Sequence, residues 1–220
     1  AEYINSKQGV TVDLTIGGAQ VSGGDASGDV LTNIDDLTGS QFDDELIGDA
    51  SDNRLDGQAG KNLLVGGAGN DTFISTVFSD ENPDTGDDFN SADYSFNTVG
   101  QEITVTTSGS QLSVVDGLGG TDTIINIDRI TGSAGDDSFT IGSAWTGSLK
   151  SGFNSTSGDG TFLDIRGGAG NDTINGNGFT RINYADATGD VTVSFSGDGA
   201  GTASGAGVGT DTFTGINIVT

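Results

Sequence analysis

Residues 39–74 decide the fold, because they divide without a gap into four nonapeptides: GSQFDDELI, GDASDNRLD, GQAGKNLLV and GGAGNDTFI. Each begins with Gly and carries Leu or Phe at position eight. The position-six residues are Asp44, Asn53, Asn62 and Asp71. An apolar residue every nine positions, with polar Gly-rich loops between, is typical of a parallel β-solenoid. We therefore predict an all-β, right-handed parallel β-solenoid (a β-roll or β-helix) with irregular insertions. Two nonapeptides would make one coil of about 18 residues, with position eight pointing inward.

A second, longer repeat has a period of about 90 residues. Tyr3, Tyr94 and Tyr184 each precede an alternating strand segment, and we predict that they are packing residues. Each unit later carries a related line: DVLTNIDDLTGS, DTIINIDRITGS or DTFTGINIVT. The last line stops where the next Gly should follow, so we expect a segment of a longer repetitive protein. The predicted units are 1–92, with the array 39–74 and an acidic loop 80–88; 93–182, with motifs at 132–140 and 167–175; and a partial unit 183–220.

The composition excludes several classes of function. The 220 residues include 32 acidic and 7 basic side chains, for a net charge of −25, which disfavours nucleic acid and anionic membranes as partners. His and Cys are absent, which removes imidazole and thiolate metal sites, disulfides and catalysis by Ser-His or Cys-His pairs. No apolar stretch approaches the roughly 18 residues of a membrane span, so we predict no membrane insertion. The Asp pairs lie in loops and no cluster joins them to Lys or Arg, so we predict no enzyme.

These motifs resemble the RTX, or haemolysin-type, calcium-binding nonapeptide repeat, G-G-x-G-x-D-x-U-x, in the form found in large repetitive bacterial surface proteins. The segments 66–74 (GGAGNDTFI) and 167–175 (GGAGNDTIN) fit closely, and 132–140 (GSAGDDSFT) and 39–47 fit well. The resemblance implies Ca²⁺ bound between turns by loop carbonyls and position-six carboxylates one coil apart. The residues it implicates are Asp44, Asn53, Asn62, Asp71, Gly66, Gly69, Asp137, Asp172, Gly167 and Gly170.

The 18-residue spacing places Asp44 opposite Asn62 and Asn53 opposite Asp71. Each pair then has one carboxylate and one amide, so we expect weak sites, with dissociation constants of about 10⁻⁴ to 10⁻³ M. Asp137 and Asp172 are each the single good match of their own array, and Asn154 stands 18 residues before Asp172. A separate candidate for calcium lies in the acidic loop, where oxygen ligands recur at alternate positions. Its residues are Asp80, Asn82, Asp84 and Asp87.

Two alternatives remain open from the residues alone. Stacked Asn and Asp side chains could cap the turns of a metal-free solenoid, although a net charge of −25 favours bound cations. Trp145 could fill the solenoid where the period fails, or could present a ring to surface glycans.

The preferred function is a calcium-stabilised structural segment of a secreted or surface-borne bacterial protein: an adhesin, a surface layer or an extracellular filament. Self-association through stacked repeats, as a fibre or lattice, is expected. The alternative is a calcium-folded export module of an enzyme or toxin whose catalytic domain lies elsewhere, and the resemblance implies type I secretion. In either case the chain is predicted to be extracellular.

Overall fold

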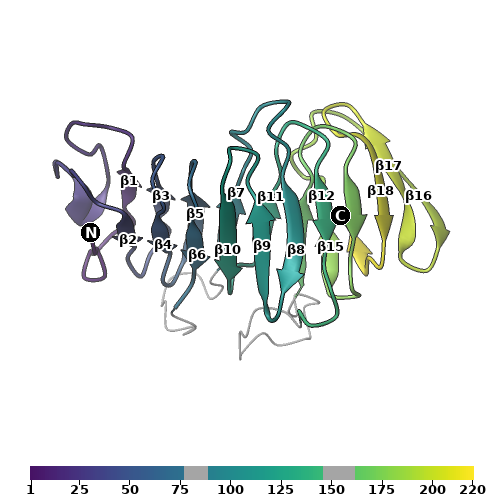
Figure 1. Cartoon of the computed structure of the whole chain (residues 1–220), viewed down its shortest axis with the longest axis horizontal. Helices are drawn as coiled ribbons and strands as arrows, with labels where there is room; N and C mark the ends of the chain where they lie inside the picture. Colours follow the sequence, from purple (N-terminus) through teal and green to yellow (C-terminus); the bar gives the residue numbers. More distant parts are fainter. Residues whose placement is uncertain (77–88, 146–161) are drawn as a thin grey trace.

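The computed structural model describes residues 1–76, 89–145 and 162–220, and in these ranges it is all-β apart from one 3₁₀ turn, η1 (Gly24–Ala26). Two sheets face each other along the long axis of the molecule (Figure 1). The first sheet has eight strands, in the order β1 (Thr11–Asp13), β3 (Glu45–Ile47), β5 (Lys61–Val65), β7 (Phe89–Asp93), β11 (Arg129–Thr131), β13 (Leu163–Arg166), β15 (Thr180–Ile182) and β19 (Ile218–Val219).

The second sheet has eleven strands, and all antiparallel pairs between the named strands of the described residues belong to it. Its order is β16 (Val191–Gly197), β17 (Ala200–Gly205), β18 (Gly209–Thr214), β14 (Thr173–Asn175), β12 (Ser138–Thr140), β8 (Thr104–Ser108), β9 (Gln111–Val115), β10 (Thr121–Ile125), β6 (Thr72–Ile74), β4 (Arg54–Asp56) and β2 (Asp36–Thr38).

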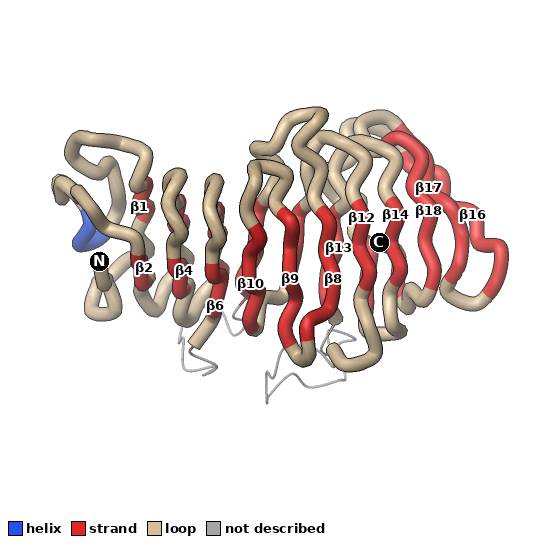
Figure 2. Tube along the Cα trace, in the orientation of Figure 1, coloured by secondary structure: helices blue, strands red, loops and turns tan. Residues whose placement is uncertain are grey.

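The chain alternates between the two sheets as it advances, which Figure 2 shows as strands of one sheet lying in front of those of the other. We call the path from one strand to its next neighbour in the same sheet a coil. In the array 39–74 the register pairs Leu46 with Leu64 and Leu55 with Phe73, as the 18-residue period predicts. All four side chains are completely buried, so the inward position eight is confirmed. The expected β-rich roll with parallel sheets is present.

Two antiparallel insertions depart from the purely parallel prediction. Strands β8, β9 and β10 form one meander, and β16, β17 and β18 form the other. Their tight turns contain Gly109 and Gly199, with φ of 64° and 69°, in the left-handed region that Gly adopts without a steric penalty. The meanders lengthen a coil without changing which strands pair: Phe73 pairs with Ile124, 51 residues later.

The ends of the two sheets have strands with one neighbour each. These are β1 and β2 at one end of the roll, where Glu2 also bridges Thr38 on the outer edge of β2, and β16 and β19 at the other. No helix within the described ranges has the length and apolar character needed to cross a lipid bilayer.

Candidate metal centre

The position-six side chain of each nonapeptide bends back toward the Gly at position one. A methyl group on Gly66 would overlap Asp71 Oδ2, and one on Gly167 would overlap Asp172 Oδ2. The position-one Gly is therefore required by the space that the carboxylate occupies. The position-four glycine, Gly69 in the same loop, has a φ of 116°, which an L side chain rarely adopts.

The same side chains form a ladder of hydrogen bonds from coil to coil. The backbone N–H of Asp44 donates to Asn62 Oδ1 at 2.9 Å, and that of Asn53 donates to Asp71 Oδ1 at 2.8 Å. The facing pairs predicted from the spacing are therefore present. Each side chain accepts a backbone N–H of the preceding coil.

The ladder extends to pairs that the 18-residue count does not find. The N–H of Asp137 donates to Asp172 Oδ1 at 2.9 Å, and the N–H of Asp172 donates to Asp211 Oδ1 at 3.0 Å. The sequence assigned Asp137 and Asp172 to separate arrays, and the structure brings them together across 35 residues, because β12 pairs with β14. Asn154 lies outside the described residues.

Two of the ladder carboxylates are fully hydrogen-bonded by a serine at position two. Ser40 donates to Asp44 through its N–H at 2.5 Å and its hydroxyl at 2.8 Å. Ser133 donates to Asp137 in the same way, at 2.6 and 2.7 Å. Burial raises the pKa of both carboxyls to about 6, against these hydrogen bonds. Both acids therefore have partners without a metal ion.

The ladder asparagines are satisfied in a similar way. Asn62 Nδ2 donates to the Gly57 carbonyl at 2.7 Å. Asn53 Oδ1 accepts the N–H of Asp49 at 2.7 Å, and Asn53 Nδ2 donates to the Asp35 carbonyl at 3.1 Å. Stacked amides hold these turns by hydrogen bonds alone, as the metal-free alternative proposes for them.

Asp71 and Asp172 are different, because Gly replaces Ser at position two of their nonapeptides. Each is 1% exposed, and each has an Oδ2 atom with no hydrogen-bond partner. Burial, together with the charges of neighbouring aspartates, raises the pKa of Asp71 to about 7 and that of Asp172 to about 8. An unpartnered buried carboxylate is costly, and a hard cation that accepts carboxylate and carbonyl oxygens removes the cost. These two loops therefore fit Ca²⁺.

Two aspartates outside the predicted set complete the ladder. Asp122 Oδ1 accepts the N–H of Asp71 at 2.9 Å, and Asp122 Oδ2 accepts the hydroxyl of Tyr94 at 2.8 Å. Asp211 Oδ2 likewise accepts the hydroxyl of Tyr184 at 2.9 Å. The available signal was the string G-T-D-T, which occurs at 120–123 and 209–212. The unit-start tyrosines thus pack in or against the core and also anchor a ladder carboxylate.

The remaining site predictions have separate outcomes. The acidic-loop candidates Asp80, Asn82, Asp84 and Asp87 lie outside the described residues. Among the residues that are described, no group of three or more acidic side chains converges to hold a metal ion. A cation at Asp71 or Asp172 would consequently need backbone carbonyls as well as carboxylates.

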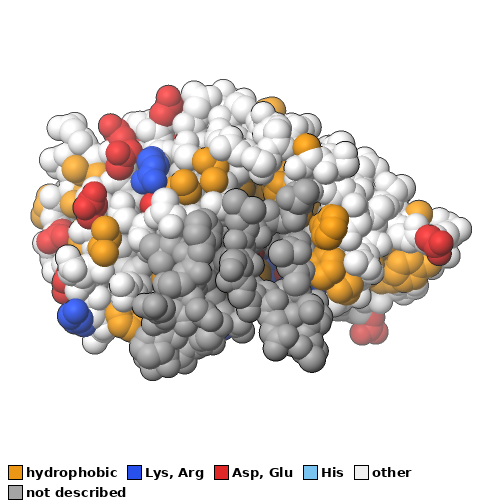
Figure 3. Space-filling view, turned by 90° about the horizontal axis from the view of Figure 1, so that it is seen from below, with side chains coloured by type: hydrophobic (Ala, Val, Ile, Leu, Met, Phe, Trp, Pro, Cys, Tyr) orange, Lys and Arg blue, Asp and Glu red, His pale blue; other side chains and the backbone are white. Residues whose placement is uncertain are grey.

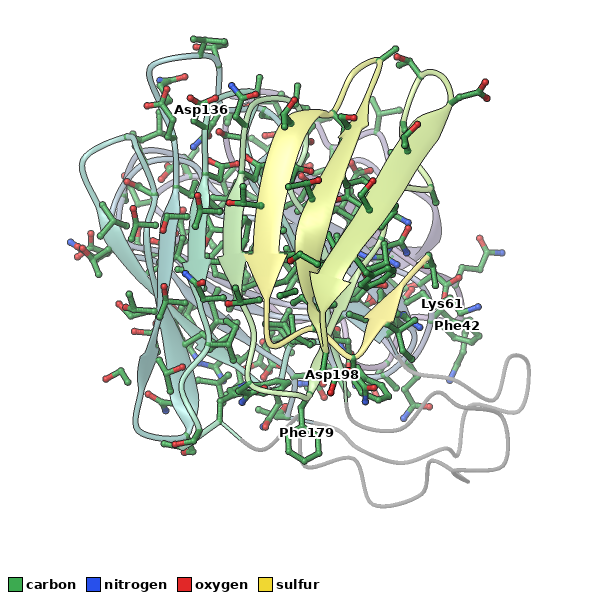
Figure 4. The ribbon with its side chains drawn as sticks, turned by 90° about the vertical axis from the view of Figure 1, so that its right-hand side faces the viewer. Phe42, Lys61, Asp136, Phe179 and Asp198 are labelled. Atoms are coloured by element: carbon green, nitrogen blue, oxygen red, sulfur yellow. The ribbon has the colours of Figure 1, made fainter. Side chains whose placement is uncertain are left out.

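The exposed charge is arranged differently from the buried charge. The acidic side chains visible in Figure 3 lie mostly toward the left end of that face, whereas the ladder acids are buried. Along the axis, Asp136 of the loop before β12 and Lys61 of the eight-stranded sheet lie on opposite sides (Figure 4). The buried ladder carboxylates therefore need a counter-ion more than the exposed acids do, because water does not solvate them.

Basic residues gather on the outer face of the eight-stranded sheet. Arg129 and Arg181 both pair with Asp164 Oδ2, at 3.0 and 2.7 Å. Burial would raise the pKa of Asp164, but the two guanidinium groups lower it. A groove of about 640 Å³ crosses this face beside Arg129 and Arg166.

Trp145 is 5% exposed and belongs to the core cluster, so packing is its role and its ring face is not available to a glycan.

The two facing sheets, which are parallel outside the meanders, the buried rows at position eight and the carboxylate ladder define a calcium-type nonapeptide repeat. The model of the RTX calcium-binding nonapeptide repeat family matches residues 38–73, 126–142 and 164–179, in 4 copies. These segments are RTX repeats, so the resemblance is confirmed, and such repeats bind Ca²⁺. A comparison with curated proteins finds none that matches the chain.

The requirement for Gly at position one gives a direct test. Gly66→Ala is expected to lower the free energy of unfolding by about 2 kcal/mol or more, because the methyl group must displace the Asp71 carboxylate and lies 2.9 Å from Phe73 Cζ. Gly18→Ala is the matched control, since no atom lies within 4 Å of its added methyl group. Urea denaturation of both variants measures the difference, and equal stabilities would contradict the packing of this loop.

Proposed function

We propose that this chain is a calcium-stabilised structural repeat segment of a secreted or cell-surface bacterial protein, such as an adhesin, a surface layer or an extracellular filament. The observation that carries the proposal is the unpartnered, buried Oδ2 atoms of Asp71 and Asp172 within repeats of a calcium-binding family. The proposal assigns no catalytic activity, nucleic-acid binding or membrane insertion to the chain.

The proposal includes the finer architecture. The chain would wind as a right-handed parallel β-solenoid in units 1–92, 93–182 and 183–220. Three equivalent hydrogen bonds support this division: Tyr3 donates to Asp29 at 3.0 Å, in the position that Tyr94 and Tyr184 occupy in the later units. Each unit would thus begin with a tyrosine whose hydroxyl donates to the aspartate that opens the related segment later in the same unit.

Calcium would act as a folding switch. In low-calcium cytosol, a net charge of −25 and the buried carboxylates oppose the compact state. The unfolded chain would be suited to export through a type I channel. Outside the cell, an ion that binds only the folded form stabilises it by RT ln(1 + [L]/Kd), about 1.4 kcal/mol per site when free Ca²⁺ is ten times Kd.

Self-association follows from the open strand edges. Strands β16 and β19 at one end of the roll pair on one side only. At the other end, Glu2 bridges Thr38 of β2, and side chains of Ser22 and Gln20 accept N–H groups of β1. Unpaired edges are templates for further strands, so stacking of repeats end to end would extend both sheets. Glycans remain an additional candidate partner of such a surface protein.

An alternative with the same chemistry is a calcium-folded export module of a type I-secreted enzyme or toxin whose catalytic domain lies outside this chain. The two proposals share the folding switch and differ in assembly. A module of that kind folds with calcium and stays monomeric, whereas a structural segment forms filaments or sheets.

Circular dichroism during Ca²⁺ titration of EDTA-stripped protein tests the switch, with electron microscopy of the same samples. We expect a transition from coil to β-structure near millimolar Ca²⁺, followed by ordered assemblies. A folded chain that does not respond to Ca²⁺ would overturn the proposal. A calcium-dependent fold that stays monomeric at high protein concentration would favour the export module.

A further inference from the structure

The loop that joins β9 to β10 brings an additional buried carboxylate to the end of the first nonapeptide array. Asp116 is completely buried. Its Oδ1 accepts the N–H groups of Leu118, Gly119 and Gly120 at 2.8, 3.0 and 2.8 Å. Three donors hold one oxygen of the carboxylate, and its Oδ2 atom has no hydrogen-bond partner.

This second oxygen faces the loop of the last nonapeptide. Strand β10 pairs with β6, so loop 116–120 lies beside loop 66–71. A methyl group on Gly120 would overlap the Gly69 carbonyl oxygen and would lie 2.8 Å from Asp116 Oδ2. The Gly69 carbonyl oxygen therefore occupies the place that a Cβ on residue 120 would take, and the absence of that Cβ brings it close to the Asp116 carboxylate.

Asp71, in the same loop as Gly69, supplies the other unpartnered oxygen. Its backbone N–H is bound to Asp122, which places the two loops in register. Both oxygens of Asp122 are used, by Asp71 and by the hydroxyl of Tyr94, so Asp122 is a positioning residue. The unsatisfied acceptors at this seam are the Oδ2 atoms of Asp71 and Asp116.

We propose that a divalent cation of the calcium type binds at the seam between the first and second units, between Asp71 and Asp116, with the Gly69 carbonyl as a further ligand. Two carboxylates and a carbonyl are oxygen ligands that Ca²⁺ prefers, and two negative charges match its own. Asp116 belongs to the β9–β10 loop, outside the matched nonapeptide segments. The inference rests on the proposed calcium dependence and adds a site that joins two units.

The next seam provides an internal comparison. There β18 takes the place of β10. Asp116 lies opposite Gly120 at the first seam, where its N–H donates to the Gly120 carbonyl, and Gly205 lies opposite Gly209 at the second. Gly205 therefore takes the place of Asp116. The Asp172 loop therefore lacks the additional carboxylate. Because affinity for Ca²⁺ rises with the number of charged ligands, the first seam is expected to bind Ca²⁺ more tightly than the second.

The test is equilibrium dialysis and calorimetric titration with Ca²⁺ of the whole 220-residue chain and of Asp116→Asn. The amide keeps an oxygen for the three N–H donors and removes the charge. The tightest class of site is expected to weaken at least tenfold. Asp52→Asn is the matched control, because Asp52 is an exposed acid that raises the pKa of Asp71 and accepts the N–H of Asn70. It is expected to change affinity less than twofold.

The outcomes separate this inference from the proposed function. Wild-type protein that binds no Ca²⁺ overturns both. Wild-type protein that binds and folds with Ca²⁺, with Asp116→Asn unchanged in affinity, overturns the seam site alone. If Asp116→Asn does not fold in saturating Ca²⁺, a crystal structure of the wild-type chain grown with Ca²⁺ decides. An ion between Asp71 and Asp116 supports the site, and a direct carboxyl–carboxyl hydrogen bond without an ion overturns it.

Discussion

Lowering the pH from about 8 to about 5 is expected to raise the thermal midpoint of the ion-free chain and to lower that of the calcium-loaded chain. Burial raises the pKa of Asp71 to about 7 and that of Asp172 to about 8. In the unfolded chain both groups titrate near 3.8, the ordinary value for this carboxyl. Thermal melts in EDTA and in excess Ca²⁺ across this range measure the two slopes.

The sign follows from proton linkage. The folded state holds the Asp71 and Asp172 protons more tightly than the unfolded state, so their favourable contribution is complete below about pH 4 and is lost as the pH rises through about 7 and 8. For each group the loss amounts to about 1.4 kcal/mol for every pH unit between the two pKa values. Ca²⁺ requires the ionised carboxylates, so protons compete with it and the slope reverses in the loaded chain.

Two controls separate these groups from the general charge. High ionic strength screens the repulsion between surface charges of a chain with a net charge of −25, and it changes the pKa of the buried carboxyls much less. The double variant Asp71→Asn, Asp172→Asn is expected to flatten the ion-free slope above about pH 6, below which Asp44, Asp122 and Asp137 still contribute. An ion-free midpoint that rises with pH between about 5 and 8 would contradict the buried, unpartnered state of both carboxyls.

The features that repeat every nine residues were predictable from the sequence. The inward Leu46, Leu55 and Leu64, and the facing of Asp44 and Asn62, follow from local alternation and from a constant coil length. A one-residue error of register would expose the whole apolar row, so the pattern specifies its own alignment strongly.

The contacts across the insertions were not predictable by counting. Asp71 meets Asp122 after 51 residues and Asp137 meets Asp172 after 35, because a meander or loop can be added to a coil without altering the strand pairing around it. Gly109 and the Asp198–Gly199 pair were the local signals for the two meanders, because glycine adopts the positive φ that a two-residue hairpin turn requires. The position of Asp116 depends on this hairpin and has no counterpart in the nonapeptide pattern.

Whether both oxygens of a ladder carboxylate have hydrogen-bond partners depends on the residue at position two of its nonapeptide. Ser40 and Ser133 donate hydroxyl and N–H groups to their position-six aspartates, and Gly67 in the corresponding place has no hydroxyl to donate. The second glycine of the family pattern G-G-x-G-x-D therefore determines that one oxygen of the position-six aspartate lacks a hydrogen-bond donor. Where serine stands at this position its hydroxyl is a partner of the buried acid, and where glycine stands one oxygen of the acid is left for a cation.

Phe73→Ala is expected to lower the free energy of unfolding by about 3–5 kcal/mol, the largest effect of any single substitution considered. Phe73 is completely buried, in the row that runs from Leu55 to Ile124. Its ring also packs against Tyr94, with centroids 5.9 Å apart and planes inclined at 60°. Chemical denaturation in saturating Ca²⁺ measures the loss.

The same substitution should weaken calcium binding, because Phe73 supports the tyrosine whose hydroxyl holds Asp122 against the Asp71 loop. Phe96→Ala is the control: its side chain is 66% exposed, so a change within about 0.5 kcal/mol is expected. If Phe73→Ala lowers stability without altering Ca²⁺ affinity, the hydrophobic row and the carboxylate ladder are independent at the seam. If it alters both, packing of the core across the insertion is what brings the two loops close enough to share an ion.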